Sequence, residues 1–290
     1  MERTIIDVRG LSVIIGEKEI LNNVSFEVFQ EDYFIIFGLD DSGKTVLLSV
    51  LMGLVRKYVG EVKVFGQNIE YPNLYPKEHI RLVPDDIIME KGIKVEEYFQ
   101  FMRRGLIEYD KELEQRLCNK YNINYKEYLL DLTYQKNKLT AIIAAMCARP
   151  GLLILDEPYN FLEKSIMIDI LNELNEINNK GTCVIVTAEK YEDLFGYGSR
   201  YLYLKDGTVK STDKIFEKNA CIKAVTISKK CDLSKYMHEI IYEDQNSITY
   251  KYFGNVDKLL NILLTSECKD CTIENLSFEE ELEFFSEEEI

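Results

Sequence analysis

The sequence lacks any apolar run that approaches the roughly 20 residues a helix needs to cross a bilayer. Its first 10 residues alternate charged and apolar side chains, without the basic end and long apolar stretch of a signal peptide. We therefore expect a cytosolic protein, held at a membrane only if a partner binds it there.

Positive charge is also scarce, because 35 Lys and Arg stand against 50 Asp and Glu, giving a net charge of −15. A nucleic-acid-binding protein needs a basic surface to neutralise phosphates, so we do not expect that activity. Part of the negative charge lies in the tail between Glu279 and Glu289. Such a tail is usually a solvated chain end, and a binding role is the alternative.

Cysteine and histidine, the usual zinc ligands, are few, with seven and two residues. The seven cysteines are scattered and odd in number, which fits a reducing compartment. Cys268 and Cys271 form one Cys-x-x-Cys pair, without a second pair or nearby histidines. An ordinary reduced pair is favoured there, with a zinc or redox site as the alternative. His79 and His238 are isolated, and neither is interpreted as catalytic or metal-binding.

The hydrophobic content of 46% is sufficient for a globular core, and it is arranged in short strands and helices. Continuous apolar strands that alternate with helices indicate a parallel sheet covered on both faces. A helical pattern occupies Asp86 to Arg149, and a hairpin is predicted from Arg200–Leu204 and Thr208–Lys210. Glycines 10, 16 and 38 punctuate the first strands. The other predicted strands are Thr4–Val8, Val24–Val28, Tyr33–Phe37, Glu61–Phe65, Leu152–Leu155 and Thr182–Thr187, and the helices are Val46–Leu54 and Leu162–Asn178.

The pattern changes at about Asp213, where short strands surround one helix. Cys221–Ile227 and Ser247–Phe253 are predicted strands, and Val256–Thr265 is a predicted helix. We therefore expect two domains, a nucleotide-binding domain at residues 1–212 and a small α+β domain at residues 213–290.

The segment Gly38–Thr45 matches the phosphate-loop pattern G-x-x-x-x-G-K-[ST] between a predicted strand and a predicted helix. In such a loop, backbone N–H groups and the helix N-terminus converge on phosphate oxygens. Gly43 permits close backbone approach, Lys44 brings positive charge to the β- and γ-phosphates, and Thr45 offers a hydroxyl to Mg²⁺. An ordinary strand–turn–helix is the alternative.

A second motif is the apolar strand Leu152–Leu155, which runs directly into Asp156 and Glu157. Ligands bind at this end of the strands in such sheets. Asp156 can hold Mg²⁺, usually through water, and Glu157 can orient and deprotonate an attacking water. An acidic turn after a strand is common, but this order of two motifs makes a chance arrangement a poor explanation.

Over almost the whole chain, these segments resemble the ATP-binding subunits of ABC transporters. The resemblance implies a P-loop NTPase of ABC type, with a mixed sheet, a helical subdomain at about residues 86–149 and an exporter-type accessory domain. It also implies two subunits that sandwich two ATP molecules, a separate membrane permease, and export. The similar segments are ILNNVSFEV, GEVKVFG, KVEEYFQF, LLILDEP, YLYLKDGTV and IENLSFEEELEFF.

The resemblance also places the site residues. The expected catalytic residue is Glu157, and the expected cofactors are ATP and Mg²⁺, with Thr45, Asp156 and Asp85 facing the metal. Ile15 takes the place of an aromatic residue that stacks on adenine, and Asp85 that of a glutamine. Asp41 replaces a glycine and adds negative charge beside the phosphates. The expected nucleotide-binding residues are Gly38, Leu39, Asp40, Asp41, Ser42, Gly43, Lys44, Thr45, Val46 and Ile15.

Other departures affect the hydrolytic cycle. The family's Leu-Ser-Gly-Gly-Gln signature aligns with Leu132–Lys136, where both glycines are lost. Lys136 adds a positive charge there, and the sequence does not tell where its side chain points. The family's histidine near the γ-phosphate aligns with Glu189, and its loop aspartate with Glu163. These changes predict a heteromeric complex with slow or asymmetric hydrolysis. A non-catalytic ATP-binding module is the alternative, and a soluble ABC protein acting on ribosomes or DNA is a weaker one.

Overall fold

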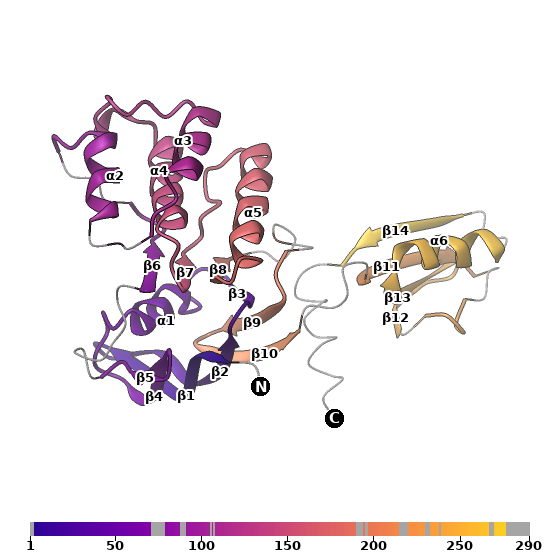
Figure 1. Cartoon of the computed structure of the whole chain (residues 1–290). Helices are drawn as coiled ribbons and strands as arrows, with labels where there is room; N and C mark the ends of the chain where they lie inside the picture. Colours follow the sequence, from indigo (N-terminus) through magenta and orange to yellow (C-terminus); the bar gives the residue numbers. More distant parts are fainter. Residues whose placement is uncertain are drawn as a thin grey trace. The chain divides into compact units, whose positions relative to one another are not determined.

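The computed structural model divides the chain into two compact units, Met1–Lys214 and Ile215–Ile290 (Figure 1). Each unit is described by itself. The acidic tail, Cys268 and His238 lie outside the described residues. The structure describes residues 3–70, 79–87, 91–104, 106, 108–189, 194, 197–214, 220–229, 233–237, 239–266 and 270–276.

A six-stranded mixed sheet forms the centre of the first unit, in the order β10-β9-β3-β8-β7-β6. The five strands from β9 to β6 are parallel, and only β10 pairs antiparallel with its neighbour. Every residue of β3, β7 and β8 is buried, which is why these strands are apolar or aromatic in the sequence except for Thr187. The strands are β3 (Tyr33–Phe37), β6 (Ile80–Val83), β7 (Leu152–Leu155), β8 (Cys183–Ala188), β9 (Arg200–Lys205) and β10 (Thr208–Lys214).

A second, antiparallel sheet has the order β2-β1-β4-β5. Its strands are longer than the sequence predicted, because β1 does not stop at Gly10. That glycine has a φ of 60° and the pairing register shifts between Val8 and Leu11, so the strand bulges there and continues. The strands are β1 (Thr4–Ile15), β2 (Lys18–Phe29), β4 (Val59–Val64) and β5 (Gln67–Asn68).

Helix α1 (Lys44–Leu51) packs into the core shared by the two sheets. Each fully buried leucine contributes about 2 kcal/mol, so packing holds a helix of eight residues that is too short to be stable alone. The helix ends before the predicted Leu54 because Gly53, with a φ of 68°, terminates it. The Gly53 N–H donates to Val50 O and the Leu54 N–H to Ser49 O, which is the Schellman arrangement.

The predicted helical region contains α2 (Val95–Arg103), α3 (Lys111–Lys120) and α4 (Tyr134–Cys147), drawn together in magenta in Figure 1. Thr133 caps α4 by accepting the Lys136 N–H, and the helix is buried from Lys138 to Cys147. Helix α5 (Lys164–Asn178) follows β7 and begins two residues after the predicted Leu162.

The second unit is an antiparallel sheet in the order β12-β13-β11-β14 with one helix, α6 (Val256–Thr265). Its small core includes Val225, Ile227, Leu259 and Leu263. Strands β11 (Ala220–Ser228) and β13 (Ser247–Asn255) confirm the two predicted strands, whereas β12 (Glu239–Glu243) and β14 (Cys271–Asn275) were not predicted.

No helix among the described residues is both long and apolar enough to span a membrane.

Candidate nucleotide-binding site

The phosphate-loop residues form a tight turn between β3 and α1. The Gly38 N–H donates to Ala188 O at 3.2 Å, which ties the start of the loop to the end of β8. Gly43 has a φ of 104°, and a Cβ there would lie 2.7 Å from a methyl group of Leu21. Only glycine therefore fits this position without strain. Asp41 also adopts a left-handed conformation, with a φ of 61°, although it carries a side chain.

Lys44 places a buried ammonium group inside this turn. Its Nζ donates to Gly38 O at 2.5 Å and to Leu39 O at 3.0 Å, and lies 3.2 Å from Glu157 Oε1. The side chain is only 5% exposed, so water screens its charge poorly. The loop thus presents a fixed positive charge together with the free N–H groups at the start of α1.

Thr45 and Asp156 bring a hydroxyl and a carboxylate together. Thr45 Oγ1 donates to Asp156 Oδ2 at 2.9 Å, and Thr187 Oγ1 donates to Asp156 Oδ1 at 2.6 Å. Burial raises the pKa of Asp156, and the two hydroxyl hydrogen bonds lower it. Hard oxygen ligands of this kind suit Mg²⁺, so the residues present fit the metal that a P-loop protein uses.

Glu157 is held by contacts to its backbone N–H and to both of its carboxylate oxygens. Its N–H donates to Thr187 Oγ1 at 2.8 Å, and its φ of 41° is left-handed. Oε1 faces Lys44, and Oε2 accepts a hydrogen bond of 2.8 Å from Asn160 Nδ2. Strained backbone of this kind often accompanies functional sites, because the surrounding contacts must hold it in place.

A cluster of three carboxylates stands beside the loop. One oxygen each from Asp40, Glu157 and Glu189 lies within 4.8 Å of the others. The pKa of Glu189 is raised, first by its hydrogen bond to Asp40, then by burial and by the charges of Asp40 and Glu157, while Lys44 lowers it. The sequence pointed to Glu189 as a repulsive group, but it gave no sign of the Asp40 contact, because that pair forms across two separate loops.

Asp85 follows β6 and is linked to Glu157 through the side chain of Asn160. Its Oδ1 accepts hydrogen bonds from Asn160 Nδ2 at 3.4 Å and from Lys138 Nζ at 3.1 Å. Sequence reasoning missed both Lys138 and Asn160. The sequence shows Lys138 only as a lysine just before the apolar run of α4, six residues after the residue aligned with the signature leucine, and it does not identify Asp85 as its partner.

The segment aligned with the family signature occupies the start of α4. Tyr134 fills the position of the first missing glycine, and its hydroxyl donates to Asp85 O at 3.0 Å. The Tyr134 ring packs edge-on against Phe161, with centroids 5.2 Å apart. Lys136 Nζ donates to Asn122 O at 2.8 Å, so its ammonium group points toward a carbonyl of its own chain.

The remaining expected positions have simpler surroundings. Ile15 is the last residue of β1, pairs with Lys18 and is 51% exposed. Leu39 and Thr45 are exposed, whereas Val46 is partly buried against the core. Glu163 precedes α5 and makes no capping hydrogen bond with its side chain.

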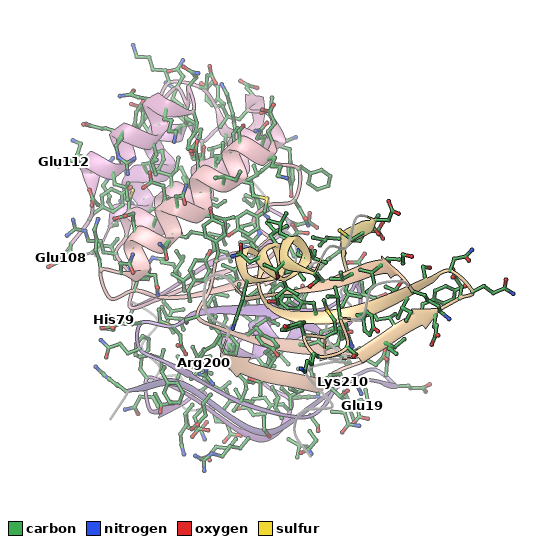
Figure 2. All side chains as sticks on the ribbon, turned by 90° about the vertical axis from the view of Figure 1, so that its right-hand side faces the viewer. Glu19, His79, Glu108, Glu112, Arg200 and Lys210 are labelled. Carbon is green, nitrogen blue, oxygen red and sulfur yellow. The ribbon has the colours of Figure 1, made fainter. Side chains whose placement is uncertain are left out.

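An open pocket of about 950 Å³ lies at the opposite edge of the large sheet, where β6, β7 and β8 begin. Figure 2 labels His79, Glu108 and Glu112 along this edge of the first unit. Charges of both signs line the pocket, and Arg116 forms two hydrogen bonds of 2.6 Å with the Glu173 carboxylate. The phosphate loop, after β3, and Asp156, after β7, lie at the other edge of the sheet.

The glycine-bounded loop contains the buried Lys44, and the Thr45 hydroxyl at the start of α1 meets the Asp156 carboxylate after β7. This combination defines a P-loop nucleotide-binding protein. Residues 21–160 match the family model described as ABC transporter. This segment carries the phosphate loop and the Asp156-Glu157 pair, and through it the chain is similar to the ABC transporter ATP-binding proteins, a family of ATPases.

Individual relatives agree with this family. The chain is 27% identical over 195 residues to the energy-coupling factor transporter ATP-binding protein EcfA1 of Mycoplasma pneumoniae, covering 64% of this chain and 70% of that one. An uncharacterized ABC transporter ATP-binding protein of Methanocaldococcus jannaschii is 26% identical, covering 85% and 86%. A solved ATP-binding subunit of an ABC transporter superimposes with a TM-score of 0.66 at 20% identity, covering 73% and 90%.

Proposed function

We propose that this chain binds Mg·ATP through residues 38–46 and drives a separate membrane permease. The observation that carries this proposal is the convergence of the Thr45 hydroxyl and the Asp156 carboxylate at 2.9 Å, beside the buried Lys44 ammonium. Lys44 would contact the β- and γ-phosphates, and Ile15 would pack on the adenine. Thr45, Asp156 and Asp85 would hold Mg²⁺, which supplies positive charge to neutralise the phosphates.

Glu157 is the proposed general base for hydrolysis. Lys44 and Asn160 hold its two carboxylate oxygens, so the group is oriented before water arrives. Asp40 and Glu189 add negative charge where hydrolysis also builds negative charge, which opposes the reaction. We therefore expect hydrolysis to be slow.

The proposed assembly contains a second ATP-binding subunit, a membrane permease and no nucleic acid. A partner with an intact signature segment would leave one altered element in each of the two ATP sites, whereas a homodimer would combine both. This favours a heteromer. We place it in the cytoplasm, on the inner face of the membrane, and propose export because residues 213–290 resemble an exporter's accessory domain.

A second candidate is a non-catalytic ATP-binding module with a structural or regulatory role in a heteromeric transporter. The position of Glu189, hydrogen-bonded to Asp40 beside Glu157, favours it, because the family's histidine would donate to phosphate there. The intact Glu157 favours hydrolysis, since a purely structural subunit has no chemical need of it.

Two measurements test these proposals: nucleotide binding tests the site that both functions share, and hydrolysis separates the two functions. Saturable binding of a fluorescent ATP analogue, weakened about tenfold or more by Lys44→Ala, is expected from the loss of charge-assisted hydrogen bonds. ATP hydrolysis is then measured with and without the membrane partner for wild type and Glu157→Gln. A loss of about 10²-fold or more in turnover supports catalysis by Glu157. Unchanged turnover would exclude it, and unchanged nucleotide binding in Lys44→Ala would exclude the proposed site.

A further inference from the structure

Lys138 is a lysine whose side chain is completely buried within the first unit. It lies in α4, and its exposed fraction is 0%. Its Nζ donates to Pro84 O at 3.1 Å, to Asp85 O at 2.7 Å and to Asp156 O at 3.4 Å. It also donates to Asp85 Oδ1 at 3.1 Å. A buried ammonium is tolerated only when its donors are satisfied, and here oxygens surround it.

These acceptors belong to the two segments that deliver the metal-facing carboxylates. Pro84 and Asp85 directly follow β6, and Asp156 directly follows β7. Lys138 itself comes from a third element, four residues after α4 begins at Tyr134. One ammonium group therefore holds α4 against the carboxyl ends of two neighbouring strands.

The contacts of Asp85 continue toward the phosphate loop. Asn160 Nδ2 donates to Asp85 Oδ1 at 3.4 Å and to Glu157 Oε2 at 2.8 Å. The other oxygen of Glu157 lies 3.2 Å from Lys44 Nζ. A chain of polar contacts thus runs from Lys138 through Asp85, Asn160 and Glu157 to Lys44.

The charges along this chain are complementary. Where the family has a neutral glutamine, this sequence has Asp85, whose carboxylate adds to the negative charge of Asp156 and Glu157. An uncompensated carboxylate there would repel both these groups and a bound triphosphate. The buried ammonium of Lys138 lies close enough to offset the Asp85 charge and to fix the orientation of Oδ1.

We propose that Lys138 is a positioning residue that makes Asp85 usable at the nucleotide site, by compensating its charge and by holding the carboxylate that Asn160 links to Glu157. This inference rests on the proposed function, because it assigns Asp85 a place beside Mg·ATP. Lys138 touches no nucleotide; it acts through Asp85.

A double-mutant cycle tests the pair, using Lys138→Gln, Asp85→Asn and the double variant. Chemical unfolding without nucleotide and the dissociation constant for Mg·ATP are measured for each. Lys138→Gln should raise that constant about tenfold in the wild-type background. In the Asp85→Asn background, the same change should raise it by no more than about threefold, because no carboxylate is left uncompensated.

A matched control is the Lys120–Asp169 ion pair, 2.8 Å long, which joins α3 and α5 away from the loop. Lys120→Gln should leave Mg·ATP binding within about twofold of the wild type. If the two site substitutions are additive in their effects on Mg·ATP binding, the role of Lys138 is overturned. If the folded wild type binds no Mg·ATP, the proposed function is overturned instead, so the two failures are distinguishable.

Discussion

Thr45 and Asp156 are 111 positions apart in the sequence, and their side chains share a hydrogen bond of 2.9 Å. The two residues reach one another because Asp156 directly follows β7, and Thr45 lies in the first turn of α1, after the phosphate loop that follows β3 at the same edge of the sheet. Thr187, from the end of β8, completes the contact by donating to the other oxygen of Asp156. Three separate segments thus converge on one carboxylate.

Removing this convergence should remove the dependence of nucleotide binding on magnesium. For Thr45→Val and Asp156→Asn, we expect the affinity for ATP in Mg²⁺ to fall about tenfold or more, toward the value measured in EDTA. Isothermal titration with and without the metal measures this. Thr208→Val, which removes a hydroxyl from an exposed hairpin, is the matched control. Retention of the full magnesium effect in both site variants would contradict the assignment.

The Asp40–Glu189 contact predicts a pH-dependent stability. The pKa of Glu189 is raised above 4.5 in the folded protein, so its protonated form is the one that folding favours. The corresponding stabilisation is fully present below about pH 4.5 and is lost as the pH rises through the folded pKa. Glu189→Gln, which stays neutral, should therefore gain stability relative to wild type as the pH rises.

Urea unfolding between about pH 4 and 8 measures this difference. The Asp40→Asn substitution removes the carboxylate that contributes most to the raised pKa of Glu189. In that background, the pH-dependent gain in unfolding free energy caused by Glu189→Gln should therefore be smaller. A gain that is constant across the pH range would show that the contact does not shift the titration of Glu189.

Asp41→Gly should change nucleotide affinity more than stability. Glycine relieves the left-handed backbone at φ 61°, but it also gains unfolded-state entropy, and the two effects of about 1 kcal/mol each oppose one another. Two unit charges about 6 Å apart in water interact by roughly 0.7 kcal/mol, or about threefold in affinity, and this sets the scale of the gain from removing the Asp41 carboxylate from the phosphate loop. Tighter ATP binding at nearly unchanged unfolding midpoint is the expected result, and weaker binding would contradict it.

Leu259→Ala tests whether the second unit is stabilised by its own core. Leu259 is fully buried there, and its truncation should cost about 2–5 kcal/mol. Circular dichroism during denaturation should show the second unit unfolding earlier, while ATP binding at low denaturant stays unchanged. Leu264→Ala, on the exposed side of α6, is the control. A parallel loss of ATP binding in Leu259→Ala would show that the two units do not fold independently.

Continuous burial explains how much of the fold could be predicted. Strands β3, β7 and β8 are buried along their whole length, so their sequences are apolar or aromatic except for Thr187 near the end of β8. Strand β1 was predicted too short because the glycine at position 10, which forms a bulge in the structure, is typical of the end of a strand in a sequence. Strand β12 was missed because its described residues are exposed, which leaves no apolar alternation to detect.

The candidate site was predictable where local sequence determines local geometry. The segment Gly38–Thr45 is recognisable from its own residue types and spacing, and Asp156-Glu157 from the apolar strand that precedes it. Lys138 and Asn160 could not be found in this way, because each acquires its meaning from Asp85, 53 and 75 positions away. Tertiary contact alone brings those groups together.

The aromatic pair of Tyr134 and Phe161 changes what the start of α4 presents to its surroundings. Two adjacent glycines would expose bare backbone, which recognises anions through N–H groups and responds strongly to salt. Here Tyr134 is 40% exposed and Phe161 is 78% exposed, and their rings meet edge to face, so aromatic surface is exposed beside the start of α4. We expect a partner that binds here to contact these aromatic side chains. The affinity contributed by that contact comes from dispersion and the removal of water, so it should depend little on ionic strength.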